Sequence, residues 1–493
     1  MNRVVLVSNR VPAPAAAGTQ AGGLAVALEG LMERRGGTWF GWSGRVSDEL
    51  GVKTVSAGGV DYATIDLTQD EHDRYYTEFS NSTLWPLLHS LPELMSFDRR
   101  NAAVYRQVNE KFADALVPML RANDLIWVHD YHLFCLPALL RARGVRAPIG
   151  FFLHIPFPSC EMLALAPEAS ALVKDLLAAD LIGFQTENDL NNFNTAAERS
   201  GCATLLPDRR LLVAGRRVRI GVFPVEIETR AFAKTARIAS TNAPAVRLRR
   251  SVAGQALILG VDRMDPTKGL PQRLAGYRRL LETRPQWHRR VTFLQIAAES
   301  RSDVASYREL RTQIEQEAGA INSAFSEPDW SPLRLMARAG ARNTVAGYMR
   351  AARVGLVTPL RDGMNLVAKE FVAAQDPADP GVLMLSPFAG AAEQLGAALQ
   401  VNPYDTDQMA DMLDQALTMP LRERLERWQA CWDAIEGHSA LGWGRSFVAA
   451  LLRASLGAIP HYERIKSQVL FAGAPITKGV QLQTASRQPY QIS

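Results

Sequence analysis

Short runs of consecutive apolar residues alternate along the chain with longer stretches in which apolar residues recur every three or four positions. The runs include residues 4–7, 125–128, 149–153, 181–184, 256–261, 291–297 and 354–357. Continuous Val, Ile and Leu runs are typical of parallel strands buried on both faces, whereas the longer spacing is typical of amphipathic helices. The alternation therefore predicts an α/β protein whose helices pack on parallel sheets.

The strand pattern lapses between about residues 229 and 255, where Arg, Ala, Ser, Thr and Asn dominate. A chain of 493 residues is too long for one ordinary hydrophobic core, so two or three domains are expected. The lapse separates two consecutive strand–helix series, and we predict Rossmann-like domains at residues 1–228 and 229–439. Residues 467–493 are polar with scattered Gly and Pro, and we predict a loose tail there.

One strand–turn–helix unit, residues 354–374, has the pattern of an anion site. Gly363 lies in the turn, and the helical spacing begins at Leu366. Free N–H groups at a helix N-terminus and the helix dipole both favour a bound phosphate. An ordinary helix start capped by Asp362 and Asn365 explains the same residues equally well.

Three charged side chains of this unit suggest a nucleotide ligand. Asp362 follows the strand directly, at the edge where α/β sheets bind ligands. Lys369 can neutralise a phosphate, and Glu370 can accept hydrogen bonds from two hydroxyls of a ribose.

Two further strand ends carry cations. Arg263 and Lys268 lie in one turn after residues 256–261, and two cations in one turn suit a diphosphate, although solvated loop charges are the alternative. Arg10 follows the first strand, and the glycine pair Gly22 and Gly23 opens the next helix. This is a second possible phosphate cradle, or a simple Gly-rich connection. The sequence G-x-G-x-x-G is absent here, which argues against a dinucleotide oxidoreductase.

In the first half of the chain, polar residues again follow buried strands. His129 and Asp130 end one strand, and His154 ends the next. His129, His132 and His154 are candidate metal ligands, but their spacing matches no familiar zinc pattern, so no metal site is predicted. Structural roles are favoured for His129 and His132.

Tyr76 and Trp85 lie in an aromatic stretch among polar residues. Aromatic residues near helical spacing are more often part of a core, but these two have polar atoms that suit a sugar acceptor.

Composition excludes several classes. The net charge is +5 and the Lys and Arg residues are spread along the chain, so no nucleic-acid-binding surface is predicted. No run of 18 apolar residues exists, so no membrane span is predicted. The four cysteines have no C-x-x-C spacing, which indicates a reducing compartment, the cytoplasm. Two domains with cations and opened helices at strand ends suggest a transferase that closes over a nucleotide-linked group and a smaller anionic acceptor.

Long strings of this chain resemble the trehalose-6-phosphate synthases, retaining glycosyltransferases of family 20 with the GT-B fold. The strings are residues 7–10, 21–24, 39–44, 79–81, 84–86, 127–132, 150–158, 183–186, 361–370, 385–386 and 388–391. The resemblance implies transfer of glucose from UDP-glucose to glucose 6-phosphate, giving α,α-trehalose 6-phosphate and UDP. It also implies that a C-terminal helix at residues 440–456 returns to the first domain.

By matching position, the resemblance implies a role for each candidate residue, with no cofactor and no metal. The implied acceptor-binding residues are Arg10, Tyr76, Trp85, Asp130 and Arg301. The implied catalytic residues are Asp362, His154, Arg263 and Lys268, the first two holding the transferred glucose and the last two neutralising the diphosphate. The implied donor-binding residues also include Gly22, Gly23, Gly340, Asn365, Leu366, Val367, Ala368, Lys369 and Glu370, with Gly340 near the uracil.

The implied mechanism is front-face substitution with retention, in which the acceptor hydroxyl attacks on the side that the diphosphate leaves. Double displacement with Asp362 as the nucleophile is the alternative. Two residues depart from the resemblance: Glu226 replaces a frequent Gly near the interdomain connection, and Pro266 replaces a common aromatic residue before Lys268.

The alternatives for function are a glucosylglycerol-phosphate synthase and an inactive regulatory homologue that binds sugar phosphate. We further expect a homo-oligomer, a role in osmoprotection and stress response, and a separate phosphatase that acts on the product. Because the resemblance extends over most of the chain, we expect no phosphatase module in it.

Overall fold

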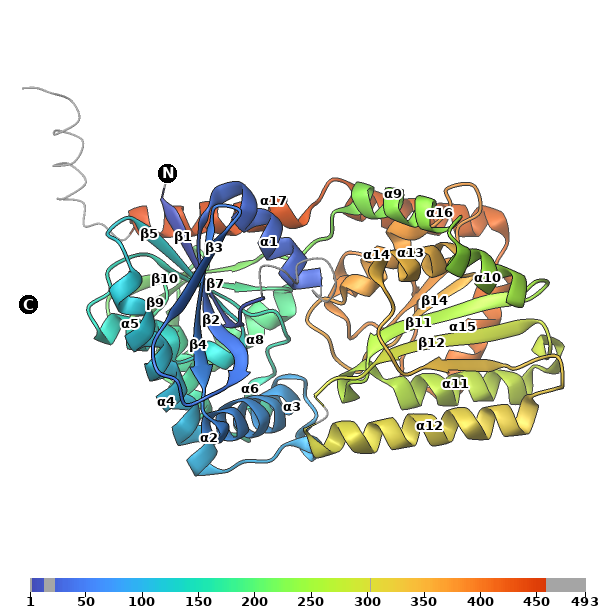
Figure 1. Ribbon diagram of the computed structural model, residues 1–493, viewed down its shortest axis with the longest axis horizontal. Helices are drawn as coiled ribbons and strands as arrows, with labels where there is room; N and C mark the ends of the chain where they lie inside the picture. The colour runs from blue at the N-terminus through green and yellow to red at the C-terminus, as the bar shows by residue number, and fades with distance from the viewer. Residues whose placement is uncertain (1, 13–22, 302, 458–493) are drawn as a thin grey trace, which may run out of the picture.

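The computed structural model describes residues 2–12, 23–301 and 303–457 and contains two lobes side by side, each built around one sheet (Figure 1). The first sheet has ten strands in the order β3-β4-β2-β1-β5-β6-β7-β10-β9-β8, and the second has six in the order β13-β12-β11-β14-β15-β16. The second sheet is parallel throughout, and the first is parallel from β4 to β10. The predicted α/β architecture is confirmed.

The centre of the first sheet includes the apolar runs recognised in the sequence, which form β1 (Arg3–Arg10), β5 (Asp124–His129), β6 (Ile149–Phe152) and β7 (Leu181–Phe184). β2 (Gly37–Val46) and β10 (Arg216–Val222) flank these four strands in the sheet. Its edges are antiparallel hairpins that the apolar pattern did not reveal: β3 (Lys53–Ala57) with β4 (Val60–Leu67), and β8 (Thr204–Leu205) with β9 (Arg210–Val213). An edge strand needs no continuous apolar run because solvent covers one side of it.

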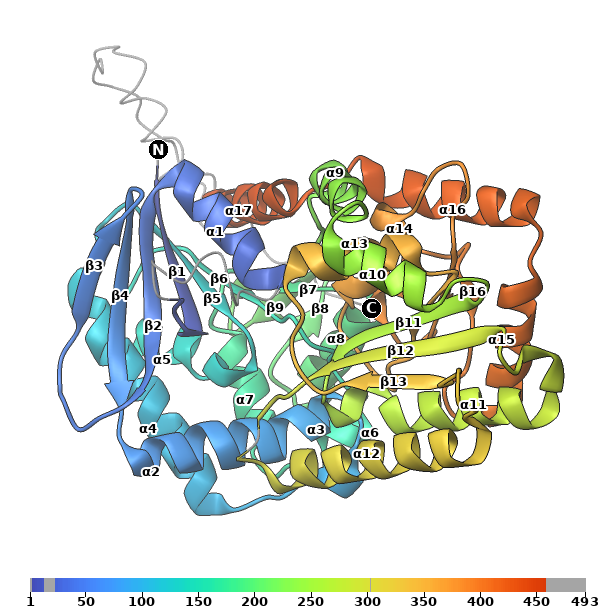
Figure 2. The same ribbon diagram turned by 45° about the vertical axis from the view of Figure 1, so that its right-hand side comes forward.

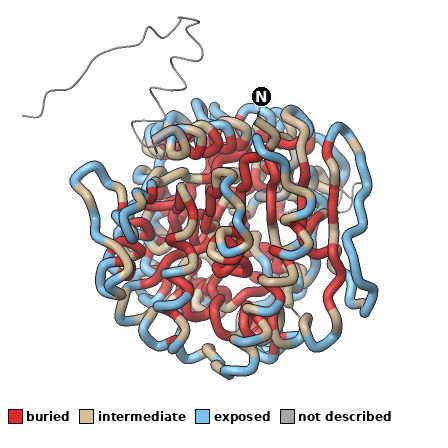
Figure 3. The backbone as a smooth tube through the Cα atoms, turned by 90° about the vertical axis from the view of Figure 1, so that its left-hand side faces the viewer, coloured by how far each residue is buried: buried red, intermediate tan, exposed pale blue. Residues whose placement is uncertain are grey.

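The helices of the first domain lie around this sheet. They include α1 (Gly23–Arg35), α4 (Arg99–Leu116), α5 (Leu136–Ala142), α6 (Cys160–Leu163), α7 (Ala169–Leu176) and α8 (Glu187–Arg199). The aromatic stretch forms α2 (Gln69–Glu71), a π-helical segment (His72–Leu84) and α3 (Trp85–Leu88) in succession. Figure 3 shows buried backbone in the interior and exposed backbone mainly in the peripheral loops.

The second sheet is covered by helices on both faces, each with its own apolar core. Its strands are β11 (Ala256–Arg263), β12 (Val291–Ala298), β13 (Leu333–Met336), β14 (Val354–Val357), β15 (Val382–Leu385) and β16 (Leu399–Gln400). One face carries α11 (Leu270–Thr283), α12 (Ala305–Phe325) and α15 (Thr406–Thr418). The other carries α9 (Thr229–Ala239), α10 (Ala243–Ser251), α13 (Arg342–Ala351), α14 (Leu366–Ala374) and α16 (Leu421–Glu436). The region without a strand pattern is therefore the helix pair α9 and α10.

The last described helix, α17 (Ala440–Gly457), runs along the first lobe rather than the second (Figures 1 and 2). Trp443 donates a hydrogen bond to the Phe223 carbonyl at 3.0 Å, and Phe447 stacks on Trp127 with 4.6 Å between ring centroids. We propose the domain division 1–228 and 229–439, with helix 440–456 joining the first domain, because these contacts support it. The tail predicted at residues 467–493 lies outside the described residues. No described helix is long and apolar enough to cross a bilayer.

Candidate active site

The turn after β14 lies directly against the turn after β6. A Cβ atom added to Gly363 would lie 2.2 Å from the His154 carbonyl oxygen and 2.9 Å from the Ile155 Cα. Only a residue without a side chain permits this approach. The predicted anion-binding turn of the second domain therefore faces the strand ends of the first.

Asn365 begins the helix of this turn. It has φ +73° and ψ 83°, a left-handed conformation that Asn tolerates, and its side chain accepts a hydrogen bond from the Ala368 N–H at 3.3 Å. Its amide donates to Asp362 at 3.0 Å. The capping interpretation is thus confirmed for Asn365, and it does not exclude an anion site because Leu366 and Val367, the first residues of α14, remain partly exposed.

Two turns of the second domain, those after β11 and β14, meet at an ion pair. The Lys268 ammonium donates a hydrogen bond to the Asp362 carboxylate, and these side chains are 12% and 15% exposed. Lys268 ends a short 3-10 turn that begins with Pro266, whose ring fixes the backbone φ angle and stiffens the loop. The turns after β11 and β14 therefore present one Lys and one Asp at the same place.

Lys369 points away from this place. Its ammonium is fully buried and donates to the Val225 carbonyl and the Glu226 carboxylate, both at 2.8 Å. The Lys369 side chain is therefore bound to Glu226 in this structure, and the expectation that it neutralises a phosphate stays a prediction. The backbone at Lys369 is a second candidate for donor binding.

Glu370 lies beside the turn that contains Gly340. Arg342, two residues after Gly340, donates to the Glu370 carboxylate at 3.2 Å, and burial raises the pKa of Glu370. Gly340 is close-packed, because an added Cβ would lie 2.7 Å from the Val345 side chain. The structure thus brings the predicted ribose acid and the predicted uracil-side glycine to neighbouring positions. Of the predicted glycine pair, Gly23 is the first residue of α1, and Gly22 lies outside the described residues.

Arg301 contacts the first domain with its guanidinium group. It donates to Tyr307 at 2.6 Å and to Tyr131 of the first domain at 3.2 Å. The guanidinium carbon lies 3.8 Å from the Trp85 ring centroid, a cation–π contact. Arg263 approaches the same ring at 5.8 Å and is half exposed.

Arg10 and Tyr76 both contact the indole ring of Trp42. The Arg10 guanidinium carbon is 6.0 Å from the Trp42 ring, and the Tyr76 ring is 5.5 Å from it. Tyr76 also stacks on His132 with 5.9 Å between centroids. The predicted phosphate-binding arginine and the predicted sugar-binding aromatic residue are therefore neighbours.

Asp130 and His154 are joined through the backbone. Asp130 has φ +73°, its carboxylate accepts the His154 N–H at 3.3 Å, and burial raises its pKa to about 6. Burial lowers the pKa of His154 to about 3, so its imidazole is neutral at pH 7. His154 Nε2 lies 2.9 Å from His129 Nδ1, which gives His129 the structural role expected for it. No group of three or more His, Cys, Asp or Glu among the described residues could hold a metal ion.

Three site residues escaped the sequence interpretation as functional candidates: Asp265, Tyr131 and Tyr307. Asp265 lies between Arg263 and Lys268, so an acid placed between two functional cations was the available signal. Tyr131 had no comparable signal, because only the meeting of the two domains brings it to Arg301. Tyr307 lies six residues after Arg301 in the same domain, within an ordinary helical stretch.

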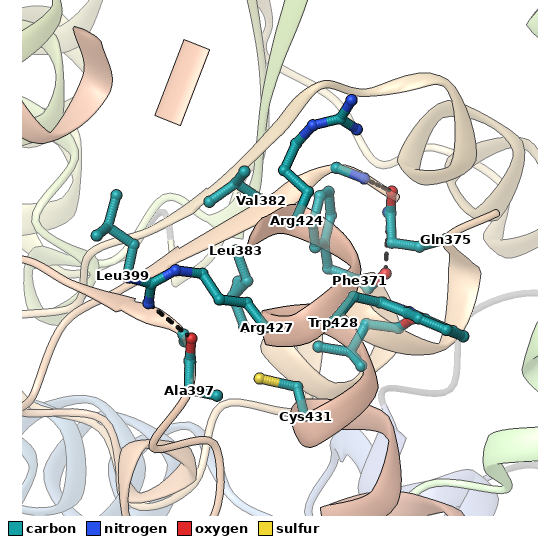
Figure 4. Close-up of a pocket in the computed structure, with 13 residues that line it drawn as sticks. Phe371, Gln375, Val382, Leu383, Ala397, Leu399, Arg424, Arg427, Trp428 and Cys431 are labelled. Atoms are coloured by element: carbon teal, nitrogen blue, oxygen red, sulfur yellow. Dashed lines mark hydrogen bonds between the residues drawn. The ribbon is translucent and has the colours of Figure 1, made fainter. Parts of the chain in front are cut away.

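A small cavity is lined by residues of α14, β15 and α16 and of the segment at residues 397–399 (Figure 4). Its polar side chains already bind backbone groups: Arg427 donates to the Ala397 carbonyl at 3.1 Å, and Gln375 accepts the Gly381 N–H at 2.9 Å. The other lining residues shown, such as Phe371 and Trp428, are largely apolar. We interpret it as a packing defect rather than a substrate site.

The fold and the facing charged turns define a GT-B glycosyltransferase. The profile of Glycosyltransferase family 20 matches residues 5–453. The chain therefore belongs to glycosyltransferase family 20.

Named relatives are similar over nearly their whole length. A trehalose-6-phosphate synthase of Sinorhizobium fredii is 45% identical over 460 residues, which cover 92% of this chain and 99% of the relative. A UDP-forming α,α-trehalose-phosphate synthase of Burkholderia xenovorans in complex with glucose-6-phosphate is 42% identical, with a TM-score of 0.88, covering 91% and 100% of the two chains. A structure described as trehalose-6-phosphate from E. coli bound with UDP-2-fluoro glucose is 43% identical, with a TM-score of 0.87, covering 91% and 98%.

Proposed function

We propose that this protein transfers glucose from UDP-glucose to glucose 6-phosphate with retention, giving α,α-trehalose 6-phosphate and UDP. The observation that carries the proposal is the meeting of two sets of groups at the domain interface. The first domain supplies Trp85 and Tyr131, and the second supplies Arg301 with the Lys268–Asp362 ion pair. The ligands named for the two related structures, glucose-6-phosphate and UDP-2-fluoro glucose, are the chemical types that these groups suit.

The donor is bound by the second domain in this proposal. The N-terminus of α14 faces the diphosphate, and Arg263 and Lys268 neutralise it. Glu370 accepts hydrogen bonds from the ribose in place of its bond from Arg342, and the backbone near Gly340 meets the uracil. Asp362 and His154 hold the hydroxyls of the transferred glucose.

The acceptor is bound mainly by the first domain. Arg10 and Arg301 bind the phosphate of glucose 6-phosphate, and Tyr76, Trp85 and Asp130 line the sugar pocket. Cations from both domains then enclose one phosphate, which favours domain closure over the bound acceptor.

The transfer step is front-face substitution. The acceptor hydroxyl forms a bond to the anomeric carbon as the bond to the diphosphate oxygen breaks on the same face. The hydroxyl proton passes to the departing phosphate oxygen. Arg263 and Lys268 stabilise the negative charge that develops there, which lowers the barrier because this charge is largest in the transition state.

The environment of Asp362 supports this route over double displacement. Its carboxylate is already engaged by the Lys268 ammonium and the Asn365 amide. These bonds lower the nucleophilicity of a carboxylate and suit a residue that accepts hydrogen bonds from sugar hydroxyls.

We extend the proposal to the setting of the reaction. The cysteines Cys135, Cys160, Cys202 and Cys431 are free, which supports a reducing, cytoplasmic location. We further propose a homo-oligomer that acts in osmoprotection and stress response, with a separate phosphatase that hydrolyses the sugar phosphate product.

A donor–acceptor matrix tests the function. Purified protein is assayed with UDP-, GDP- and ADP-glucose against glucose 6-phosphate and glycerol 3-phosphate, with nucleotide release followed and the product linkage determined by NMR. We expect turnover with UDP-glucose and glucose 6-phosphate and an α,α-linked product. Turnover with glycerol 3-phosphate alone would show that the acceptor is glycerol 3-phosphate rather than glucose 6-phosphate. UDP binding without turnover for any pair would indicate a regulatory protein.

A further inference from the structure

Asp265 occupies the centre of the contact between the two domains. It is fully buried, lies two residues after the end of β11, and stands between Arg263 and Lys268 in the chain. One carboxylate oxygen, Oδ1, accepts from the Thr267 N–H at 3.0 Å and from the Thr267 hydroxyl at 2.9 Å. These two bonds cap the short turn that ends with Lys268.

The same oxygen also binds the other domain. The Trp85 indole N–H donates to Oδ1 of Asp265 at 3.3 Å, across the domain interface. The face of this indole carries the Arg301 guanidinium at 3.8 Å. One side chain of the first domain therefore contacts both the acid and an acceptor-side cation.

The second carboxylate oxygen, Oδ2, faces the cations. The Tyr307 hydroxyl donates to it at 3.0 Å, and the guanidinium groups of Arg301 and Arg263 lie 3.8 and 3.9 Å from it. Burial alone would raise the pKa of Asp265, but the charges of Arg301, Arg263 and Lys268 outweigh it and lower the pKa below the ordinary value. Asp265 is thus an ionised group that three predicted substrate-binding cations share.

We propose that Asp265 is a positioning residue that holds the donor-side and acceptor-side cations in one arrangement and couples the binding of the two substrates. The proposal rests on the proposed function for the identity of the substrates. Asp265 touches neither substrate; it acts through Arg263, Arg301 and the capped turn of Lys268.

The coupling follows from the geometry. A sugar phosphate in the acceptor pocket is held by groups of both domains, so it favours the closed arrangement in which Trp85 reaches Asp265. That bond adds a donor to the carboxylate that caps the Lys268 turn. Since the turn is then ordered before the nucleotide arrives, less ordering opposes nucleotide binding, and the two ligands bind with positive cooperativity.

The first test is a binding experiment that needs no turnover. The Kd of UDP is measured by calorimetry with and without saturating glucose 6-phosphate. In the unmodified protein we expect UDP to bind about fivefold more tightly or better when the sugar phosphate is present. In Asp265→Asn, which keeps an oxygen for Thr267 and Trp85 but loses the charge, we expect this ratio to fall to near one.

Trp85→Phe is the second variant, because it keeps an aromatic ring beneath Arg301 and removes the indole N–H together with the five-membered ring that carries it. We expect the Kd of UDP alone to stay unchanged in this variant while the effect of glucose 6-phosphate decreases. This variant tests the coupling between the two ligands even if Asp265→Asn fails to fold.

The matched control is Asp124→Asn. Asp124 is also a buried carboxylate bound by an arginine, Arg3, at 2.8 and 2.6 Å, but it begins β5 at the edge of the sheet opposite the site. It should lower the thermal midpoint and leave kcat/KM unchanged. For Asp265→Asn we expect a loss of roughly 100-fold in kcat/KM, the scale of a misplaced catalytic group.

The outcomes separate the two proposals. Equal UDP ratios in the unmodified protein and Asp265→Asn, or no coupling in the unmodified protein, would overturn the role of Asp265. No turnover by the unmodified protein, with coupling that depends on Asp265, would overturn the proposed reaction and support the positioning role.

Discussion

The Lys369 ammonium and the Glu226 carboxylate form a buried ion pair at 2.8 Å that joins helix α14 to the segment between the two domains. Glu226 also accepts a hydrogen bond from the Gln394 amide at 2.8 Å. Glu226, which departs from the family pattern, is thus bound by two side chains of the second domain. The pair anchors the helix of the proposed donor site to the chain segment about which the domains would move.

Lys369→Met should lower the free energy of unfolding by about 3–5 kcal/mol, because it leaves the Glu226 carboxylate buried without its cation. Urea unfolding at pH 7 measures the change. The double variant Lys369→Met, Glu226→Leu should recover much of the loss, since no charge then remains buried. A single variant as stable as the unmodified protein would contradict the assigned pair.

Lys268→Ala and Arg263→Ala should each lower kcat by roughly 10²–10³-fold, the scale for removal of a group that stabilises transition-state charge. Arg263 is half exposed, so its replacement should leave the thermal midpoint within about 2 °C of its original value. Arg422→Ala, at a side chain that is 91% exposed, is the control for a surface arginine. Near-normal turnover of either site variant would refute the diphosphate assignment.

Arg10→Ala should raise the KM for glucose 6-phosphate by about tenfold or more, because a charge-assisted contact to phosphate is lost. The KM for UDP-glucose should change by less than about twofold, since Arg10 lies over Trp42 in the first domain. Steady-state kinetics with each substrate varied in turn separate the two constants. If only the KM for UDP-glucose changed, the assignment of Arg10 to the acceptor site would be wrong.

The protein should lose stability as the pH falls from about 6.5 toward 4. Burial lowers the pKa of His89 to about 4 and that of His154 to about 3, and it lowers the pKa values of His129 and His132 well below 6.5. In this window the unfolded chain binds protons that the folded protein does not. The free energy of unfolding should fall by roughly 1.4 kcal/mol per pH unit for each such histidine. Thermal unfolding measured between pH 7 and 5 checks this expectation.

Buried carboxyls oppose this trend. Burial raises the pKa values of Asp130 and Asp189 to about 6, so their contribution to stability is present at low pH and is lost as the pH rises from about 3.8 through 6. Burial also raises the pKa values of Asp262 and Glu370, so the loss below about pH 6 is smaller than the histidines alone would give. His89→Asn keeps a donor toward the Trp85 carbonyl, which His89 meets at 2.8 Å, and should reduce the slope by about one proton. An unchanged slope would contradict the buried, neutral state of His89.

The sequence by itself determined the alternation of strands and helices and the positions of the chemistry along it. Continuous apolar runs such as residues 256–261 form strands because burial on both faces requires them. Charged residues that follow these runs, such as Arg263 and Asp362, lie at the ligand-binding edge because parallel strands all end there. Edge strands such as β3 were missed, because an exposed strand has no such apolar run.

Only the tertiary structure decided where the side chains in those turns point. Lys369 and Lys268 both seemed suited to a phosphate from their place in the chain, yet Lys369 binds Glu226, 143 residues away, and Lys268 binds Asp362, 94 residues away. Likewise Asp265 accepts a hydrogen bond from Trp85, 180 residues away in the first domain, and its position in the chain does not reveal this contact. Periodicity specifies which face of an element is buried, but a long charged side chain follows the opposite charge that the fold brings within reach.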